Sequence, residues 1–581
     1  MIPRTMIWAN YRRNHVGMDT IAVPAPVDGA PNVPWWYDKI AMLANEWARC
    51  GFTDVLFPNP VMGESGSFNT GDGYNPFDDY DIGSKGKPTR FGTADLFRRA
   101  VAICHANGLN VLLDNVVHQR MGGRAGVYRY RSATGKDNGR FPKDPPCFRG
   151  SPPRVPEDPV PSPPDDYPFG DQLCPVNAHP YHYVWDGLIA ASDWLFRTSD
   201  ADGGRLDDMK GMNVGFMKSY MNSGAMKRKW FFGEYASGNR NDTNWWVDQV
   251  RGRASALDFD FHYNMVMPMC MDAGSGNFFM GQLAGRGMIG NNPMKAVPFV
   301  ESMDSDTNGF ATVIFNKTLG YALMFGGEGL PMAYVRDYLQ EPDCYGLGKE
   351  IQNLAWIHAR LSNGFTVPRC TWDARVYVFE RVGEPGLLMA LNNDVWNTQW
   401  KQVRVATVFP PGTQLHDYTG HNQNDVWVEA DGHVTLYVPP GADGKGYSAW
   451  SRTGLGGELP IHPRSTRQVF FGDVDLDIGP LTTATNLVSR VWCAENTDLH
   501  LMLYVKKAPD GANATLAVTD PGGNIKQETL SLSSPQSMNV AVSKTGWHSL
   551  ALLANGPEPL PFELDVTYVA TKHLHPEELS Q

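Results

Sequence analysis

Short apolar runs alternate with amphipathic helical segments over the first two thirds of the chain. The runs typical of strands lie at residues 5–11, 53–58, 110–117, 202–207, 230–235, 256–261, 297–303 and 331–335. Between them, segments such as 37–51, 93–108 and 183–196 place apolar residues at helical spacing on one face. Alternating strands and helices indicate parallel β/α units, and eight such units close into a barrel. The pattern therefore predicts an α/β fold, a (β/α)8 TIM barrel.

Two changes of pattern predict the remaining domains. Residues 119–184 follow the third strand with a long, proline-rich segment that favours an irregular inserted subdomain, so the barrel is expected to comprise 1–118 and 185–365. Short alternating strands then predict an antiparallel C-terminal β domain at 366–453. A Gly/Pro-bearing linker leads to a further run of short strands, which predicts an additional β-sandwich at 460–575.

Composition limits the classes of partner. The 62 acidic and 50 basic residues give a net charge of −12 without any basic run, which argues against nucleic acid and anionic membranes. We find no apolar stretch long enough to span a bilayer and no signal-peptide pattern, so we expect a cytoplasmic protein or the mature form of a secreted one. The 8 cysteines form no CxxC pair, which disfavours a zinc site.

Ionisable residues gather where the predicted barrel strands end. Reading those ends gives Asp114, Arg205 with Asp207, Glu234 and Asp304. Residues at the C-terminal ends of barrel strands line a common active site. In an extended strand, residues i and i+2 point the same way, so Arg205 lies beside Asp207 and keeps that carboxylate ionised. A plain salt bridge is the alternative reading of this pair.

Four ordered motifs at these strand ends resemble those of the α-amylase family of glycoside hydrolases, also called family 13. The stretch "DADGGRLDDMKGM" (200–212) is similar to the family's GxRxDxxK region, and "FFGEYAS" to its acid/base region. "FVESMD" fits its FxxxxD region, and Asp114 matches the aspartate of its first region. The similarity covers about residues 5–452.

The resemblance implies a retaining glycosidase acting on α-1,4 bonds of starch-like α-glucans, without an organic cofactor and as a monomer. Asp207 is then the nucleophile, Glu234 the acid/base and Asp304 the stabiliser of the transition state. Retaining cleavage requires this pairing of a nucleophilic carboxylate with a protonated carboxyl.

The same resemblance assigns substrate contacts. It implies that Tyr74 stacks on the sugar at the cleavage point, that Asp114 and Arg205 belong to the same subsite, and that Lys210 reaches the leaving-group side. A simply solvated Lys210 is the alternative.

Two positions depart from the family pattern. Gln119 and Met303 stand where the family has histidines that hydrogen-bond the sugar, and His118 lies one position before the first of them. Gln119 can still donate a hydrogen bond, whereas Met303 cannot. Either the subsite is remodelled, as in a glucanotransferase or a hydrolase of a differently linked α-glucoside, or the chain is a catalytically impaired glucan-binding protein.

Calcium and the last domain leave further alternatives. Many relatives bind Ca²⁺ with an asparagine at the place of His118, and Asp165, Asp166 and Asp171 are candidate oxygen donors, although such acids in a loop are also consistent with plain solvation. In the last domain, Trp492 and Trp547 suggest either polysaccharide binding or domain packing.

Overall fold

The computed structural model describes most of the chain. The described residues are 4–9, 34–63, 73–132, 135, 138–161, 170–271, 277–306, 311–341, 344–476, 478–533, 535–556 and 558–579. Within these ranges, no helix has the length and apolar character needed to cross a membrane. The chain folds into two compact units. One unit contains Glu46–Val55 and Phe232–Pro460, and the other contains Leu56–Phe231 and Ile461–Gln581.

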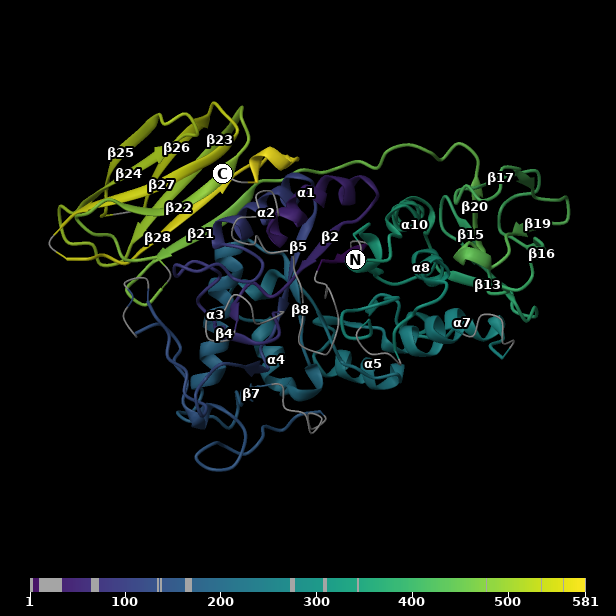
Figure 1. Cartoon of the computed structure of the whole chain (residues 1–581), viewed down its shortest axis with the longest axis horizontal. Helices are drawn as coiled ribbons and strands as arrows, with labels where there is room; N and C mark the ends of the chain where they lie inside the picture. The colour runs from purple at the N-terminus through teal and green to yellow at the C-terminus, as the bar shows by residue number, and fades with distance from the viewer. Residues whose placement is uncertain are drawn as a thin grey trace. The chain divides into compact units, whose positions relative to one another are not determined.

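Eight strands form one sheet in the order β11-β10-β9-β8-β5-β2-β1-β12. Figure 1 labels three of them, β2, β5 and β8. They are β1 (Met6–Trp8), β2 (Asp54–Phe57), β5 (Asn110–Asn115), β8 (Gly203–Leu206), β9 (Trp230–Gly233), β10 (Ala254–Leu257), β11 (Ala296–Val297) and β12 (Met332–Tyr334). β1 pairs with β12 in parallel, and a parallel bridge from Phe299 to Met332 nearly closes the sheet. The predicted TIM barrel is confirmed.

The sixth strand begins and ends earlier than its sequence pattern predicts. The expected strand at 256–261 is β10 at Ala254–Leu257, because Asp258 accepts a 3.0 Å hydrogen bond from the amide of Phe261. This cap starts the short helix α6 (Phe259–Phe261), which continues into a π-helical turn at His262–Val266. Helix replaces strand here because the capping aspartate satisfies a backbone donor that a strand would otherwise use.

Buried charges anchor the irregular segment between β5 and α3 (Tyr183–Ser199). Its regular structure is a two-stranded pair, β6 (Gln119–Arg120) with β7 (Asp171–Gln172). Lys143 Nζ lies 2.7 Å from Asp79 Oδ2, and Arg120 also pairs with Asp79. Burial by itself raises the pKa of Asp79, but the two cations outweigh burial and lower it. This charge cluster adds to the buried aromatic side chains of the segment, among them Tyr128, Phe141 and Phe148.

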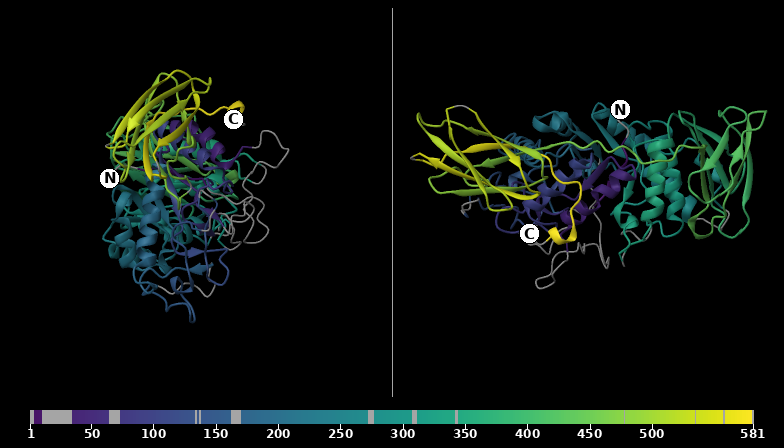
Figure 2. Two further views of the ribbon diagram at one scale, coloured as in Figure 1. Left: turned by 90° about the vertical axis from the view of Figure 1, so that its left-hand side faces the viewer. Right: turned by 90° about the horizontal axis from the view of Figure 1, so that it is seen from above.

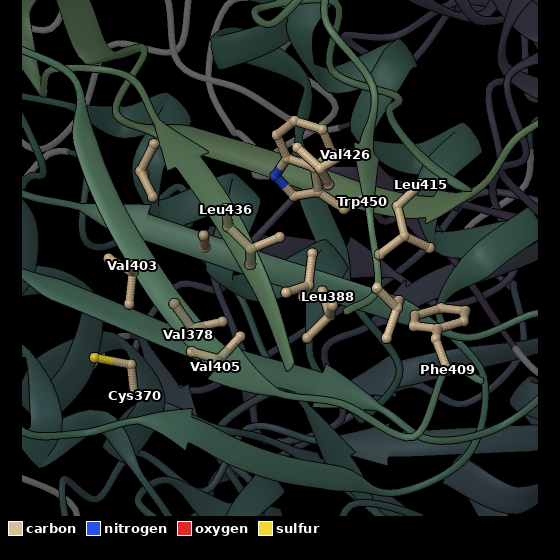
Figure 3. Packing of buried hydrophobic residues seen from close by; sticks show 14 of the residues in the cluster. Cys370, Val378, Leu388, Val403, Val405, Phe409, Leu415, Val426, Leu436 and Trp450 are labelled. Carbon is tan, nitrogen blue, oxygen red and sulfur yellow. The ribbon is translucent and has the colours of Figure 1, made fainter. Parts of the chain in front are cut away.

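The C-terminal β domain consists of two sheets around an apolar core. Its strands are β13 (Thr366–Cys370), β14 (Val376–Arg381), β15 (Leu387–Asn392), β16 (Lys401–Ala406), β17 (Gln414–Asp417), β18 (Val426–Trp427), β19 (His433–Val438) and β20 (Tyr447–Arg452). β16 pairs with β19, and the other six form the second sheet. Figure 3 shows Val403, Leu436 and Trp450 among the side chains that fill the core.

The last domain is a sandwich of two four-stranded sheets, drawn in yellow and yellow-green in Figure 2. Its strands are β21 (Thr466–Gly472), β22 (Asn486–Cys493), β23 (Thr497–Val505), β24 (Asn513–Thr519), β25 (Ile525–Ser531), β26 (Gln536–Val542), β27 (Gly546–Asn555) and β28 (Phe562–Tyr568). β22 packs against the barrel helix α2 (Ala94–Ala106), and β21 packs against α3.

One arginine of α2 is central to this packing. The guanidinium of Arg99 lies 4.8 Å from the ring centre of Trp492 and 4.9 Å from that of Trp547. It also pairs with the buried Asp38 at 2.8 Å. Trp492 is fully buried, so of the two readings of these tryptophans the structure favours domain packing.

We expect Arg99→Ala to lower the stability of the chain by about 3–5 kcal/mol, because Asp38 would remain buried without its cation. Arg490→Ala is the matched control: Arg490 stacks on Trp547 at 4.5 Å but pairs with the partly exposed Asp95, so its loss should cost about 1 kcal/mol or less. Thermal unfolding followed by circular dichroism compares the two. Equal shifts in midpoint would contradict the role assigned to the buried pair.

Candidate active site

The neighbouring strands β5 and β8 bring the first group of predicted site residues together. Asp114 and Arg205 are directly paired in the parallel register of these strands. Arg205 Nη1 donates to Asp114 Oδ1 at 2.7 Å and to Asp207 Oδ1 at 2.9 Å. Arg205 has no exposed surface. One buried cation thus holds two carboxylates from adjacent strands at fixed positions.

Tyr74 completes this group from the loop after β2. Its hydroxyl donates to Asp114 Oδ2 and accepts a 3.1 Å hydrogen bond from Arg205 Nη1. The guanidinium carbon of Arg205 lies 5.4 Å from the centre of the tyrosine ring. Because charge-assisted hydrogen bonds are short and directional, the group is pre-oriented before any ligand arrives.

Gln119 and His118 lie side by side but have different partners. Gln119 Nε2 donates to the backbone carbonyl of Tyr74 at 2.9 Å, so Gln119 supports the loop that carries the tyrosine. His118 Nδ1 lies 3.1 Å from Gln119 Oε1 and 3.2 Å from Asp208 Oδ2. Burial lowers the pKa of His118, and the nearby Asp208 opposes that shift. Both side chains are buried.

The chain reverses direction immediately after Asp207. Asp208 adopts a left-handed conformation with φ 44°, and its side chain caps the 3-10 turn Met209–Gly211. This left-handed conformation, outside the strand, directs the side chain of Asp208 toward His118. Lys210 lies half-buried in the turn that follows.

Glu234 follows directly on β9 in the other compact unit. The residue before it, Gly233, packs on Trp246: a Cβ at this position would come within 2.3 Å of the indole ring. Tyr235, the residue after it, stacks on the same indole with the ring centres 6.3 Å apart. The fully buried Trp246 thus supports the strand end on both sides of the half-buried Glu234.

Within this unit, the negative charges of both Glu234 and Asp304 act on Tyr263. Burial raises the pKa of Tyr263, and the negative charges of Asp304, Glu234 and Glu301 raise it further. The phenol is 42% exposed and therefore open to ligand. Asp304 is also exposed, whereas Met303 is fully buried. The side chain of Met303 thus has no exposed surface in this structure, and its contact with substrate stays a prediction.

A buried ionic network holds the segment that carries Asp304. Lys317 Nζ lies 3.1 Å from Glu301 Oε2 and 2.6 Å from Asp337 Oδ1. The hydroxyl of Ser305 donates to Glu301, and the amide of Val313 donates to Glu301 Oε2 at 2.9 Å. Burial raises the pKa of Glu301 to about 7, although Lys317 opposes the shift.

Sequence reasoning missed Tyr263 and this network. Glu301 carried one usable signal, since it is a charged residue inside the otherwise apolar run 297–303. Tyr263 carried none, because it lies on a π-helical turn that neither the helical nor the strand period describes. Such turns are frequent at functional sites.

The predicted calcium ligands do not form a site among the described residues. Asp165 and Asp166 lie outside these residues. Asp171 pairs with Arg154 at 2.6 Å and accepts from Tyr128 at 2.8 Å, so its oxygens are engaged by protein groups. The part of the chain that the structure describes contains no cluster of three His, Cys, Asp or Glu side chains suited to a metal ion. Calcium binding by Asp165, Asp166 and Asp171 therefore stays a prediction.

Sequence comparisons relate the chain to α-amylases. The family model described as alpha-amylase C-terminal matches residues 387–451, within the C-terminal β domain. Alpha-amylase 3, chloroplastic, of Arabidopsis thaliana is 25% identical over 325 residues, which cover 52% of this chain and only 33% of that protein. Cytoplasmic alpha-amylase of Escherichia coli (strain K12) is 22% identical over 504 residues, covering 70% of this chain and 96% of that protein.

Solved structures share the fold. The α-amylase of Geobacillus thermoleovorans, complexed with acarbose, matches with a TM-score of 0.53 at 14% identity, covering 77% of this chain and 98% of its own. The γ-CGTase of alkalophilic Bacillus clarkii matches with a TM-score of 0.59 at 16% identity, covering 97% of this chain and 94% of its own. The latter match extends over nearly the whole chain.

We expect Gly233→Ala to destabilise the chain by about 1–3 kcal/mol, because the new methyl group overlaps the indole of Trp246 and the buried strand end must shift. Gly238→Ala is the control, since the nearest atom to its Cβ would be 3.8 Å away on Tyr263. Thermal unfolding of both variants measures the difference. A fully stable Gly233→Ala chain would show that Trp246 does not fix this strand end.

Proposed function

We propose that this chain, whose sequence and fold resemble those of α-amylases, is a glycoside hydrolase that cleaves α-1,4-glucosidic bonds of starch-like α-glucans with retention of configuration. The observation that carries the proposal is the pairing of the buried Arg205 with both Asp114 and Asp207 beside Tyr74. A fully buried arginine that orients a carboxylate at the end of a barrel strand fits a nucleophile better than a surface salt bridge.

In the first step, Asp207 attacks the anomeric carbon while Glu234 gives its proton to the glycosidic oxygen. The bond from the anomeric carbon to that oxygen breaks, and an ester between the sugar and Asp207 forms. Arg205 keeps Asp207 anionic and oriented for the attack. In the second step, Glu234 takes a proton from water, whose oxygen displaces Asp207 and releases the sugar as the α-anomer.

Asp304 and Tyr263 bind the sugar during both steps. Asp304 binds ring hydroxyls more strongly as the ring flattens toward the oxocarbenium-like transition state. Tyr263 serves as a neutral donor to a sugar hydroxyl, because a phenol is protonated at neutral pH, and burial and the surrounding carboxylates raise its pKa further.

A glucanotransferase is the second candidate. The likeness to the Bacillus clarkii γ-CGTase covers 97% of this chain, whereas the match to the Geobacillus α-amylase covers 77%. In a transferase, the hydroxyl of a second glucan takes the place of water in the second step. The departures from the family pattern at Gln119 and Met303 are compatible with either outcome.

We expect Glu234→Gln to lower the cleavage of soluble starch by at least about a hundredfold, because the amide has no proton to give to the leaving oxygen. Glu384→Gln is the matched control, an exposed carboxylate paired with Arg452 in the C-terminal β domain, and should keep full activity. Reducing ends measure the rate, and products from a maltooligosaccharide ladder separate hydrolysis from transfer. Binding of glucans by the native chain without cleavage would instead support the impaired, glucan-binding alternative.

We also expect the first products to be α-anomers, observed by NMR before mutarotation. Two inversions at the anomeric carbon, one by Asp207 and one by water, preserve the configuration. Initial β-anomers would contradict the role of Asp207 as nucleophile.

A further inference from the structure

Exposed tryptophans concentrate on the C-terminal β domain. Trp372, Trp396, Trp400 and Trp427 are 66%, 77%, 44% and 57% exposed, and all lie between residues 366 and 452. Tryptophan is highly buried on average, and exposed apolar surface often marks a binding site. The tryptophans of the last domain behave differently, because Trp492 and Trp547 pack around Arg99.

Two of the exposed rings line a hollow of about 700 Å³ within this domain. Its lining combines aromatic, hydroxyl and amide side chains, among them Trp400, Asn422, Asn424, Trp427, Thr435 and Tyr437. A volume of this size accommodates a ligand of a few sugar rings.

The strands place these rings on the side opposite the core. Val426 and Leu436 point into the apolar core, as Figure 3 shows. Trp427 follows Val426, so its side chain emerges on the other face of β18, whereas the partly buried Tyr437 packs against the core cluster. The core therefore fixes the backbone on which the lining is built.

The loop that supplies the amides is held rigidly. The buried Asp417 accepts hydrogen bonds from the backbone N–H of Asn422 at 3.0 Å and from the hydroxyl of Thr419 at 2.8 Å. Asp425 accepts from Gln414 Nε2 at 2.7 Å and lies 2.8 Å from His416 Nδ1. A lining that is ordered before binding loses little conformational entropy when a ligand arrives.

Charge selects the class of ligand. The lining contains no lysine or arginine, and its acidic members Asp425 and Glu429 are already paired, Glu429 with Arg404 at 2.8 Å. The one imidazole of the lining, His421, has its Nδ1 2.9 Å from the backbone carbonyl of Tyr447, so a phosphate would meet no lysine or arginine there and would face two carboxylates. Flat indole faces with amide and hydroxyl groups suit a neutral ligand that has an apolar face and a rim of hydroxyls, which describes a pyranose ring.

We propose that this hollow is a second, non-catalytic site that binds a segment of an α-glucan chain, with Trp400 and Trp427 stacking on its sugar rings. The linkage of the glucan rests on the proposed function. A chain that binds a polymer at two places raises the effective concentration of substrate, so the site should strengthen binding to starch more than to short oligosaccharides.

The test is retention in native gels that contain soluble starch. The background is Glu234→Gln, which prevents loss of the polymer by cleavage. Trp400→Ala and Trp427→Ala are each expected to raise the dissociation constant for starch roughly tenfold, through the loss of a stacked ring. Trp372→Ala is the matched control, because Trp372 is more exposed than either residue yet lies outside the lining of the hollow.

Unchanged retention in the Trp400→Ala, Trp427→Ala double variant overturns the inference. The inference is also overturned if the double variant changes the sedimentation coefficient of the protein but not its retention by starch, because the surface would then join two copies of the chain. The proposed function is tested separately by starch cleavage in the native chain. If the native chain cleaves starch but retention does not depend on Trp400 and Trp427, only the second site is rejected. If retention depends on these tryptophans but the native chain does not cleave starch, only the hydrolase is rejected.

Discussion

The candidate active site depends on the neutralisation of one buried cation. Arg205 has no exposed surface, and an arginine cannot lose its charge, so its burial is tolerable only beside anions. Asp114 and Asp207 supply these anions from two adjacent strands. The electrostatic requirement that stabilises the barrel at this point is the same one that fixes a carboxylate in the orientation needed for attack on a sugar.

Buried charges recur where the fold leaves regular structure. Asp79 with Lys143 anchors the insertion after β5, and Glu301 with Lys317 holds the segment that carries Asp304. The insertion also buries apolar side chains, among them Tyr128 and Phe148, and Lys143 Nζ lies 3.8 Å from the ring centre of Phe141. Ion pairs in a low-dielectric interior are strongly directional, so they position such segments at the cost of desolvating each group.

The tryptophans of the two β domains differ in their surroundings. In the last domain, Trp492 and Trp547 close around Arg99 of α2 and join the sandwich to the barrel helices. In the C-terminal β domain, Trp400 and Trp427 remain exposed beside amide side chains. An α-glucan enzyme with this division would use the last domain for stability and the preceding one for contact with its polymer.

The sequence by itself determined the eight barrel strands, the two β domains and the strand ends that carry Asp207 and Glu234, because hydrophobic periodicity and motif spacing are local properties. It also placed Asp304 at the end of a strand at 297–303, but the strand β11 is only Ala296–Val297 and Asp304 lies in a turn beyond it. It also placed Arg205 beside Asp207, two residues away on the same strand. Tertiary structure decided the rest. Asp114 meets Arg205 across 91 residues of chain, through a strand register that no local pattern encodes. A side chain's environment is likewise set by neighbours distant in sequence. Which elements pack together therefore decided that Met303 is buried and that Tyr263 is exposed on a π-helical turn. It also decided the different surroundings of Trp427 and Trp492.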